Sequence, residues 1–108
     1  MKRGSIVRSV FPGDLGKPRP GLIIQISLLE ELTSSIVVLP LTSTIRPTPL
    51  FRVTVMPSAT NGLLLPSQVM VDRITNVNRT KIGGIIGTIE DDVLFEVTRR
   101  LASLLGIA

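Results

Sequence analysis

Prolines and glycines interrupt this chain at short intervals, and that punctuation restricts it to short elements over most of its length. Eight prolines and nine glycines occur in 108 residues. The clearest stretch between them is 50–56, where Phe51, Val53 and Val55 alternate with Arg52 and Thr54. Such a period of two is typical of a strand with one buried face. Further strands are predicted at 6–11, 22–26, 36–39, 67–71 and 84–89.

The segments between these strands have the composition of loops. Residues 12–20 hold three prolines and two glycines, and residues 41–49 form a second polar loop after Pro40, which is predicted to end its strand. Shorter breaks are predicted as a turn at Asn61-Gly62 and a single helical turn over 28–31 that Ser27 caps.

The apolar pattern changes near the end of the chain. Glu96 and Arg100 have the spacing of an exposed i,i+4 ion pair, and Gly106 stands where a helix C′ glycine belongs. Apolar residues recur there at helical spacing: Val93, Leu94, Val97, Leu101, Leu104 and Leu105. The chain is therefore predicted to be one mainly-β domain, residues 1–108, with five to seven short strands and a C-terminal helix. Closing so many short strand edges favours a small, strongly bent barrel.

Cysteine and histidine are both absent. Their absence excludes a disulfide framework, a thiolate metal site and a histidine general base. The acidic clusters Glu30-Glu31 and Glu90-Asp91-Asp92 fall where a helix would begin or face solvent, which indicates structural roles. No metal or other cofactor is expected.

Charge and the N-terminal segment bear on partners and location. The formal net charge is +4 and the sequence pI is near 10.7, which favours an anionic partner such as nucleic acid or an acidic protein. Residues 1–5 do not lead into the apolar stretch of a signal peptide, and no apolar run approaches the roughly 20 residues that span a bilayer. We expect a soluble, cytoplasmic protein.

Two loops carry the candidate functional residues. In the first, Pro18 and Pro20 flank Arg19 and stiffen the backbone around a guanidinium suited to phosphate oxygens, while Lys17 adds a second cation. In the second, Thr42, Ser43 and Thr44 place three hydroxyls after a buried strand. Taken separately, the first loop is more typical of a proline-rich turn with solvated charges, and the second of turn-capping hydroxyls. Taken together, adjacent strands could bring Arg19 and Thr42 side by side as an anion-binding notch.

At these loops the chain resembles the MazF/PemK (Kid) family of bacterial toxin endoribonucleases. The matching segments are Lys2–Val7, Gly16–Ile24, Val37–Ser43, Ser67–Ile74 and Ile86–Ile89 followed by the amphipathic helix. They occur in family order and spacing over residues 2–106.

The resemblance implies both a fold and a mechanism. The fold would be an SH3-like or CcdB-like barrel that forms homodimers. The activity would be metal-independent, sequence-specific cleavage of single-stranded RNA (mRNA) by the neighbouring ribose 2′-hydroxyl, leaving a cyclic phosphate. The family's essential arginine and threonine correspond to Arg19 and Thr42, which could stabilise charge on the phosphate. The partner would be an antitoxin whose acidic, disordered tail lies across the basic groove.

Other residues are candidates for binding RNA. Arginine is a poor general base, so Asp14 and Asp72 are the carboxylates considered for removing the 2′-hydroxyl proton. The expected RNA-binding residues are Asp14, Lys17, Ser43, Ser67, Asp72 and Arg73. Because tyrosine and tryptophan are absent, any base stacking would fall to Arg19, Arg73 or Phe11. Ser5 departs from the acidic residue usual in the family.

Two alternatives stay open at this point. A CcdB-like gyrase poison could share the fold, but such toxins use a tryptophan just before the position of Gly106, and this chain has none. A catalytically inactive member that only binds RNA or a partner protein is the other alternative, and the presence of both Arg19 and Thr42 argues against it.

Overall fold

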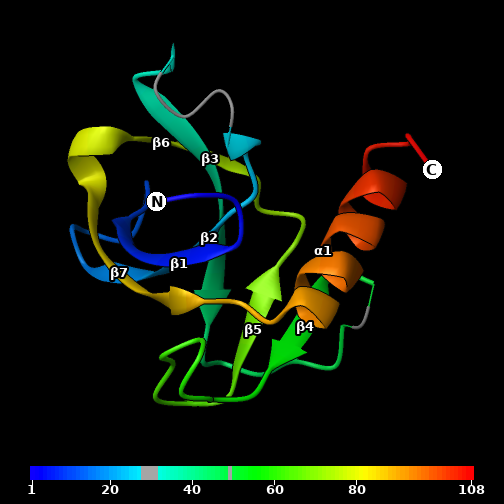
Figure 1. The fold of residues 1–108 in the computed structure, drawn as a ribbon. Helices are drawn as coiled ribbons and strands as arrows, with labels where there is room; N and C mark the ends of the chain where they lie inside the picture. Colours follow the sequence, from blue (N-terminus) through cyan, green and yellow to red (C-terminus); the bar gives the residue numbers. More distant parts are fainter. Residues whose placement is uncertain (28–31, 49) are drawn as a thin grey trace.

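The computed structural model describes residues 1–27, 32–48 and 50–108. The single helical turn predicted over 28–31 therefore lies outside the described residues. Within the described part there are seven strands, a short 3-10 helix and one α-helix (Figure 1). The strands are β1 (Ser5–Val10), β2 (Pro18–Ile23), β3 (Ser35–Thr42), β4 (Arg52–Val55), β5 (Ser67–Met70), β6 (Thr75–Asn78) and β7 (Ile82–Thr88). The helices are η2 (Arg79–Lys81) and α1 (Asp91–Leu104). The predicted mainly-β fold with a C-terminal helix is confirmed.

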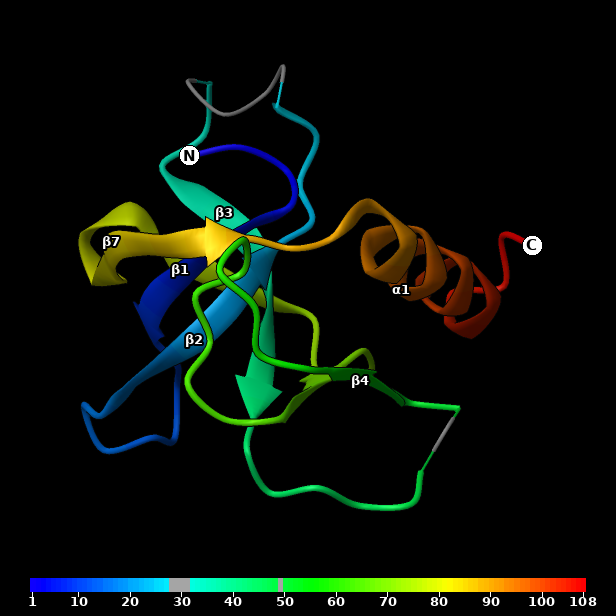
Figure 2. The ribbon, with the colours of Figure 1, turned by 60° about the horizontal axis from the view of Figure 1, so that its bottom comes forward.

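The strands form one antiparallel array in the order β4-β5-β3-β2-β1-β7, and β6 adds a second partner to β3. Strand β3 joins the two parts of the sheet, because it pairs with three other strands. Its first half pairs with β6, its middle with β2 and its last two residues with β5. The sheet bends at β3, so that β4 and β5 turn away from β1, β2 and β7 (Figure 2).

Alternating side chains of the central strands are buried on both faces, which divides the core into two clusters. The larger contains Ile6, Leu22 and Leu39 and extends through β4, β5 and Val97 of α1. The smaller contains the intervening residues of the same strands and includes Phe11. Valine, isoleucine and leucine dominate both clusters, as β-branched residues suit a pleated surface.

Helix α1 begins and ends as the sequence predicts. Glu90 is its N-cap residue, and Asp91 and Asp92 lie in its first turn, where acidic side chains favour the helix dipole. Glu96 Oε1 lies 2.7 Å from Arg100 Nε. At the C-terminus Gly106 has a φ of +75°, and a Schellman pair of hydrogen bonds closes the last turn. No helix of the described residues is long and apolar enough to cross a membrane.

Two predicted strand boundaries were wrong at prolines, and one polar strand was not predicted. Strand β2 begins at Pro18, inside the predicted loop. Its pairing with β3 begins only at Gly21, so the prolines lie where β2 has β1 as its one neighbour. Strand β3 runs past Pro40, which lies between the residues that pair with β6 and those that pair with β5. Strand β6 was not predicted, because Val77 is its one buried residue.

Candidate active site

A pocket of about 530 Å³ lies where β2 begins and β3 ends. Figure 2 shows that the β1–β2 loop lies at this same end of the sheet. Six of the eight residues predicted for the site line it: Asp14, Lys17, Arg19, Thr42, Ser43 and Ser67. They come from the β1–β2 loop, the end of β3 and the start of β5. The structure therefore gathers residues that lie as much as 53 positions apart into one concave surface (67 − 14 = 53).

The pairing of β2 with β3 brings Arg19 and Thr42 to the same pocket. In the β2–β3 ladder Gly21 is opposite Pro40 and Leu22 is opposite Leu39. That pairing ends at Gly21. Beyond it β3 pairs with β5, where Thr42 is opposite Gln68, while β2 continues beside β1, where Arg19 is opposite Ser9. Arg19 and Thr42 therefore lie just beyond the last β2–β3 pair, one on each strand, and both line the pocket. Both residues belong to strands, although the sequence placed them in loops.

Asp14 holds the Arg19 guanidinium from the side of the β1–β2 loop. Arg19 Nε lies 2.7 Å from Asp14 Oδ2, and Arg19 Nη2 donates to Asp14 Oδ1 at 3.0 Å. The loop that presents Asp14 is folded by its own backbone, since the Lys17 amide donates to the Asp14 carbonyl at 3.0 Å. One hydrogen bond and one ion-pair contact thus hold the guanidinium against the loop. The Nη1 group of Arg19 makes no hydrogen bond within the described residues and is available to a ligand.

The hydroxyl oxygen of Thr42 already accepts one hydrogen bond within the protein. Thr42 Oγ1 accepts a hydrogen bond from the Thr44 amide at 3.1 Å, which caps the turn after β3. Among the described residues no acceptor takes the Thr42 hydroxyl proton, so that proton can be donated to an anion. Ser67 differs, because its hydroxyl donates to the Leu65 carbonyl at 2.9 Å and the residue is buried.

The opposite wall of the pocket is the segment between β4 and β5, and a buried asparagine braces it. Asn61 is fully buried, and all of its side-chain hydrogen-bonding capacity is used. Its Oδ1 accepts from the amides of Ser58 and Leu63, each at 3.0 Å, and its Nδ2 donates to the Met56 carbonyl at 2.8 Å and to Glu90 Oε1 at 3.0 Å. The pocket wall is thereby tied to the start of α1.

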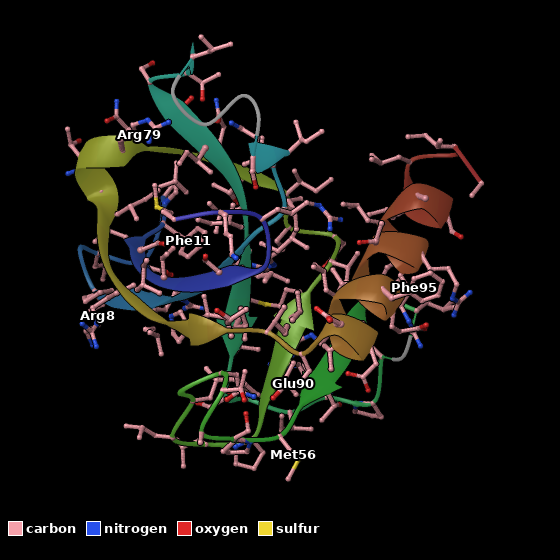
Figure 3. All side chains as sticks on the ribbon, viewed as in Figure 1. Arg8, Phe11, Met56, Arg79, Glu90 and Phe95 are labelled. Atoms are coloured by element: carbon pink, nitrogen blue, oxygen red, sulfur yellow. The ribbon has the colours of Figure 1, made fainter. Side chains whose placement is uncertain are left out.

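Glu90 completes this network (Figure 3). The Ser58 hydroxyl donates to Glu90 Oε2 at 2.6 Å. That hydrogen bond, helped by the one from Asn61, lowers the pKa of Glu90 below its ordinary value of 4.5. Beyond the braced residues, Leu64 and Leu65 stand out at the pocket rim, 92% and 60% exposed.

Three residues singled out in the sequence do not reach the pocket. Asp72 and Arg73 are exposed residues that follow the far end of β5, whereas Ser67 at its near end lines the pocket. Phe11 is 6% exposed and packs in the smaller core cluster, so it is not available to stack on a base (Figure 3). The expectation that Asp72 lies near Arg19 was therefore wrong for this chain, as was the choice of Phe11 as a stacking surface.

Arg8 is a pocket residue that the sequence reasoning missed. It was placed within the strand predicted at 6–11 without a role, although the structure leaves it exposed between two buried residues. The charged residues of the pocket lining are Arg8, Lys17, Arg19 and Asp14, a net charge of +3 − 1 = +2. This is half of the chain's net charge of +4. Among the described residues no group of three or more acidic, cysteine or histidine side chains could hold a metal ion.

The fold and the pocket define a small basic β-domain with an arginine and a hydroxyl set together for an anion. Comparison with known proteins agrees with this description. Residues 2–105 match the family of PemK-like, MazF-like toxins of type II toxin–antitoxin systems, and the chain belongs to that family. It is 35% identical over 109 residues to a probable endoribonuclease MazF of Mycolicibacterium smegmatis, which covers 100% of this chain and 99% of that protein.

Solved structures have the same fold. A MazE–MazF complex (form II) from Deinococcus radiodurans is 26% identical, with a TM-score of 0.81, covering 100% of this chain and 97% of that one. A mycobacterial endoribonuclease in complex with its cognate antitoxin is 23% identical, with a TM-score of 0.82 and the same coverage. The predicted family resemblance is confirmed.

Proposed function

We propose that this chain is a toxin endoribonuclease that cuts single-stranded RNA, mRNA included, without a metal ion. The observation that carries the proposal is that Arg19 and Thr42, each two residues beyond the last β2–β3 pair, line one pocket of net positive charge. Family membership and the 35% identity to a probable MazF endoribonuclease support the same activity.

In the proposed reaction the ribose 2′-oxygen attacks the adjacent phosphorus and the bond to the 5′-oxygen breaks. The products are a 2′,3′-cyclic phosphate and a 5′-hydroxyl end. Negative charge builds on the non-bridging oxygens, where the free N–H groups of Arg19 and the Thr42 hydroxyl stabilise it. Asp14 holds the guanidinium in place before RNA arrives, so little orientation is lost on binding.

Asp14 is also the carboxylate that we assign to the 2′-hydroxyl proton. It lines the pocket and contacts Arg19, whereas Asp72 does not line the pocket. Lys17 and Ser43 would hold RNA at the same surface. Ser67 would support the pocket floor through its bond to Leu65. We leave Asp72 and Arg73 outside the proposed site.

The proposed partners follow from charge and family. A pocket with net charge +2 is complementary to an acidic, disordered antitoxin tail, which would compete with RNA for it. A MazF of Deinococcus radiodurans has been crystallised with MazE, and a mycobacterial endoribonuclease with its cognate antitoxin. We propose the same kind of complex here, with the toxin as a homodimer.

The test is incubation of the purified protein with a mixed-sequence single-stranded RNA in excess EDTA. Discrete fragments ending in 2′,3′-cyclic phosphate are expected from the wild type, and Arg19→Ala and Thr42→Ala should reduce cleavage by at least 100-fold, as loss of a charge-stabilising donor does. Asn76→Ala, at an exposed asparagine of β6, is the matched control and should cleave normally. Intact RNA together with trapped gyrase–DNA complexes would instead favour the gyrase poison.

A further inference from the structure

Arg8 has a fixed position on the wall of the pocket. It is the exposed residue of β1, between the fully buried Val7 and Ser9. Strand β1 pairs with β2, where Pro20 is opposite Arg8, and with β7, where the register shifts between Val7 and Ser9 and Arg8 has no partner residue. Its neighbours Val7 and Ser9 are paired with β7, so the strand sets where the Arg8 side chain leaves the backbone.

The charge of Arg8 is unused within the described residues. Its guanidinium makes no hydrogen bond or ion pair there, and it extends away from the ribbon (Figure 3). Arg19, the other arginine of the pocket, is already engaged by Asp14. Six arginine side chains of the chain have hydrogen-bond partners: Arg3, Arg19, Arg52, Arg79, Arg99 and Arg100. Arg8 is thus a guanidinium at the pocket with its full donor fork available.

We infer that Arg8 binds a backbone phosphate of the RNA next to the phosphate held by Arg19, an inference that rests on the proposed function. A single strand presents one phosphate per nucleotide, so an RNA threaded through the pocket brings a second anion past the scissile one. The planar fork of arginine matches a phosphate in two hydrogen bonds. Arg8 is a positioning residue here, because it holds RNA but does not touch the scissile phosphate.

The experiment measures binding without cleavage. A mixed-sequence single-stranded RNA with 2′-O-methyl groups at every ribose lacks the attacking hydroxyl, and its affinity is followed by fluorescence anisotropy over a series of salt concentrations. Arg8→Ala should lower the slope of log affinity against log salt by about 0.7, the value for one phosphate contact on a single strand. Affinity should fall several-fold, and by the same factor for different sequences. Arg8→Lys, which keeps the charge, should recover most of the slope.

Arg73→Ala is the matched control, because it removes the same charge from an exposed position off the pocket. An unchanged slope in Arg8→Ala, or an equal loss in Arg73→Ala, would overturn the inference. A loss that varies with RNA sequence and that lysine does not rescue would indicate a base contact and would also overturn it. The wild type is tested for cleavage in parallel, so that absent cleavage with an intact Arg8 effect would count against the proposed reaction alone. Thermal unfolding of each variant reports whether the fold is retained.

Discussion

Replacing Asn61 by alanine should destabilise the protein more than its small size suggests. The side chain is fully buried and makes four hydrogen bonds between 2.8 and 3.0 Å. Alanine leaves the amides of Ser58 and Leu63 without their acceptor. An unsatisfied buried polar group costs roughly 1–3 kcal/mol. Because Ser58 is only half-buried and water can reach it, we expect a total loss of about 2–4 kcal/mol.

The assay is urea denaturation, with the slope of unfolding free energy against urea checked for constancy. A loss of about 2–4 kcal/mol is a large part of the roughly 5–15 kcal/mol that holds a domain of this size together. It should lower the thermal midpoint by roughly 10–25 °C. Asn76→Ala is the control, because Asn76 is exposed on β6 and its side chain makes no hydrogen bond within the described residues. If the two variants lose equal and small amounts, below about 0.5 kcal/mol, the reasoning is refuted.

Two further changes test other parts of the fold. Gly21→Ala would place a Cβ 2.6 Å from Val38 Cγ1, so we expect a loss of about 1–3 kcal/mol in urea denaturation, whereas Gly84→Ala meets no atom within 4 Å and should lose far less. Ser58→Ala removes the hydrogen bond that lowers the pKa of Glu90, whose stabilisation is full above the ordinary value of 4.5 and is lost as pH falls through the lower folded pKa. The stability difference between wild type and Ser58→Ala should therefore shrink between pH 6 and pH 3, and a constant difference would contradict this account.

The parts of the fold that could be predicted are those with a local period. Alternation at Val53 and Val55 and the helical spacing of α1 each report one buried face, and both patterns are read from neighbouring residues. Strand β6 has no such period, because its pairing with β3 gives it a backbone partner while leaving most of its side chains in water. A strand that is held mainly by backbone hydrogen bonds to its neighbour shows no clear pattern of apolar residues in the sequence.

Site residues could be predicted where unusual neighbouring residues draw attention to them, and could not be predicted where only strand pairing brings them to the pocket. Arg19 and Thr42 stood out because prolines and neighbouring hydroxyls surround them. Arg8 carries no such marker, and its place on the pocket depends on a register with β2 that only the folded sheet sets. Asp72 was misplaced for the converse reason, since the length of β5 separates it from Ser67.

Strand β1 has an unusual position in the order of synthesis. One edge of β1 pairs with β2, which follows it closely in the chain. The other edge pairs with β7, which is made much later, and there Ser5 is opposite Thr88. A nascent chain therefore emerges with an open β1 edge, and the pocket lacks Ile86 until β7 has been made. Under the proposed function, the surface that binds RNA is therefore complete only when nearly the whole chain has been made.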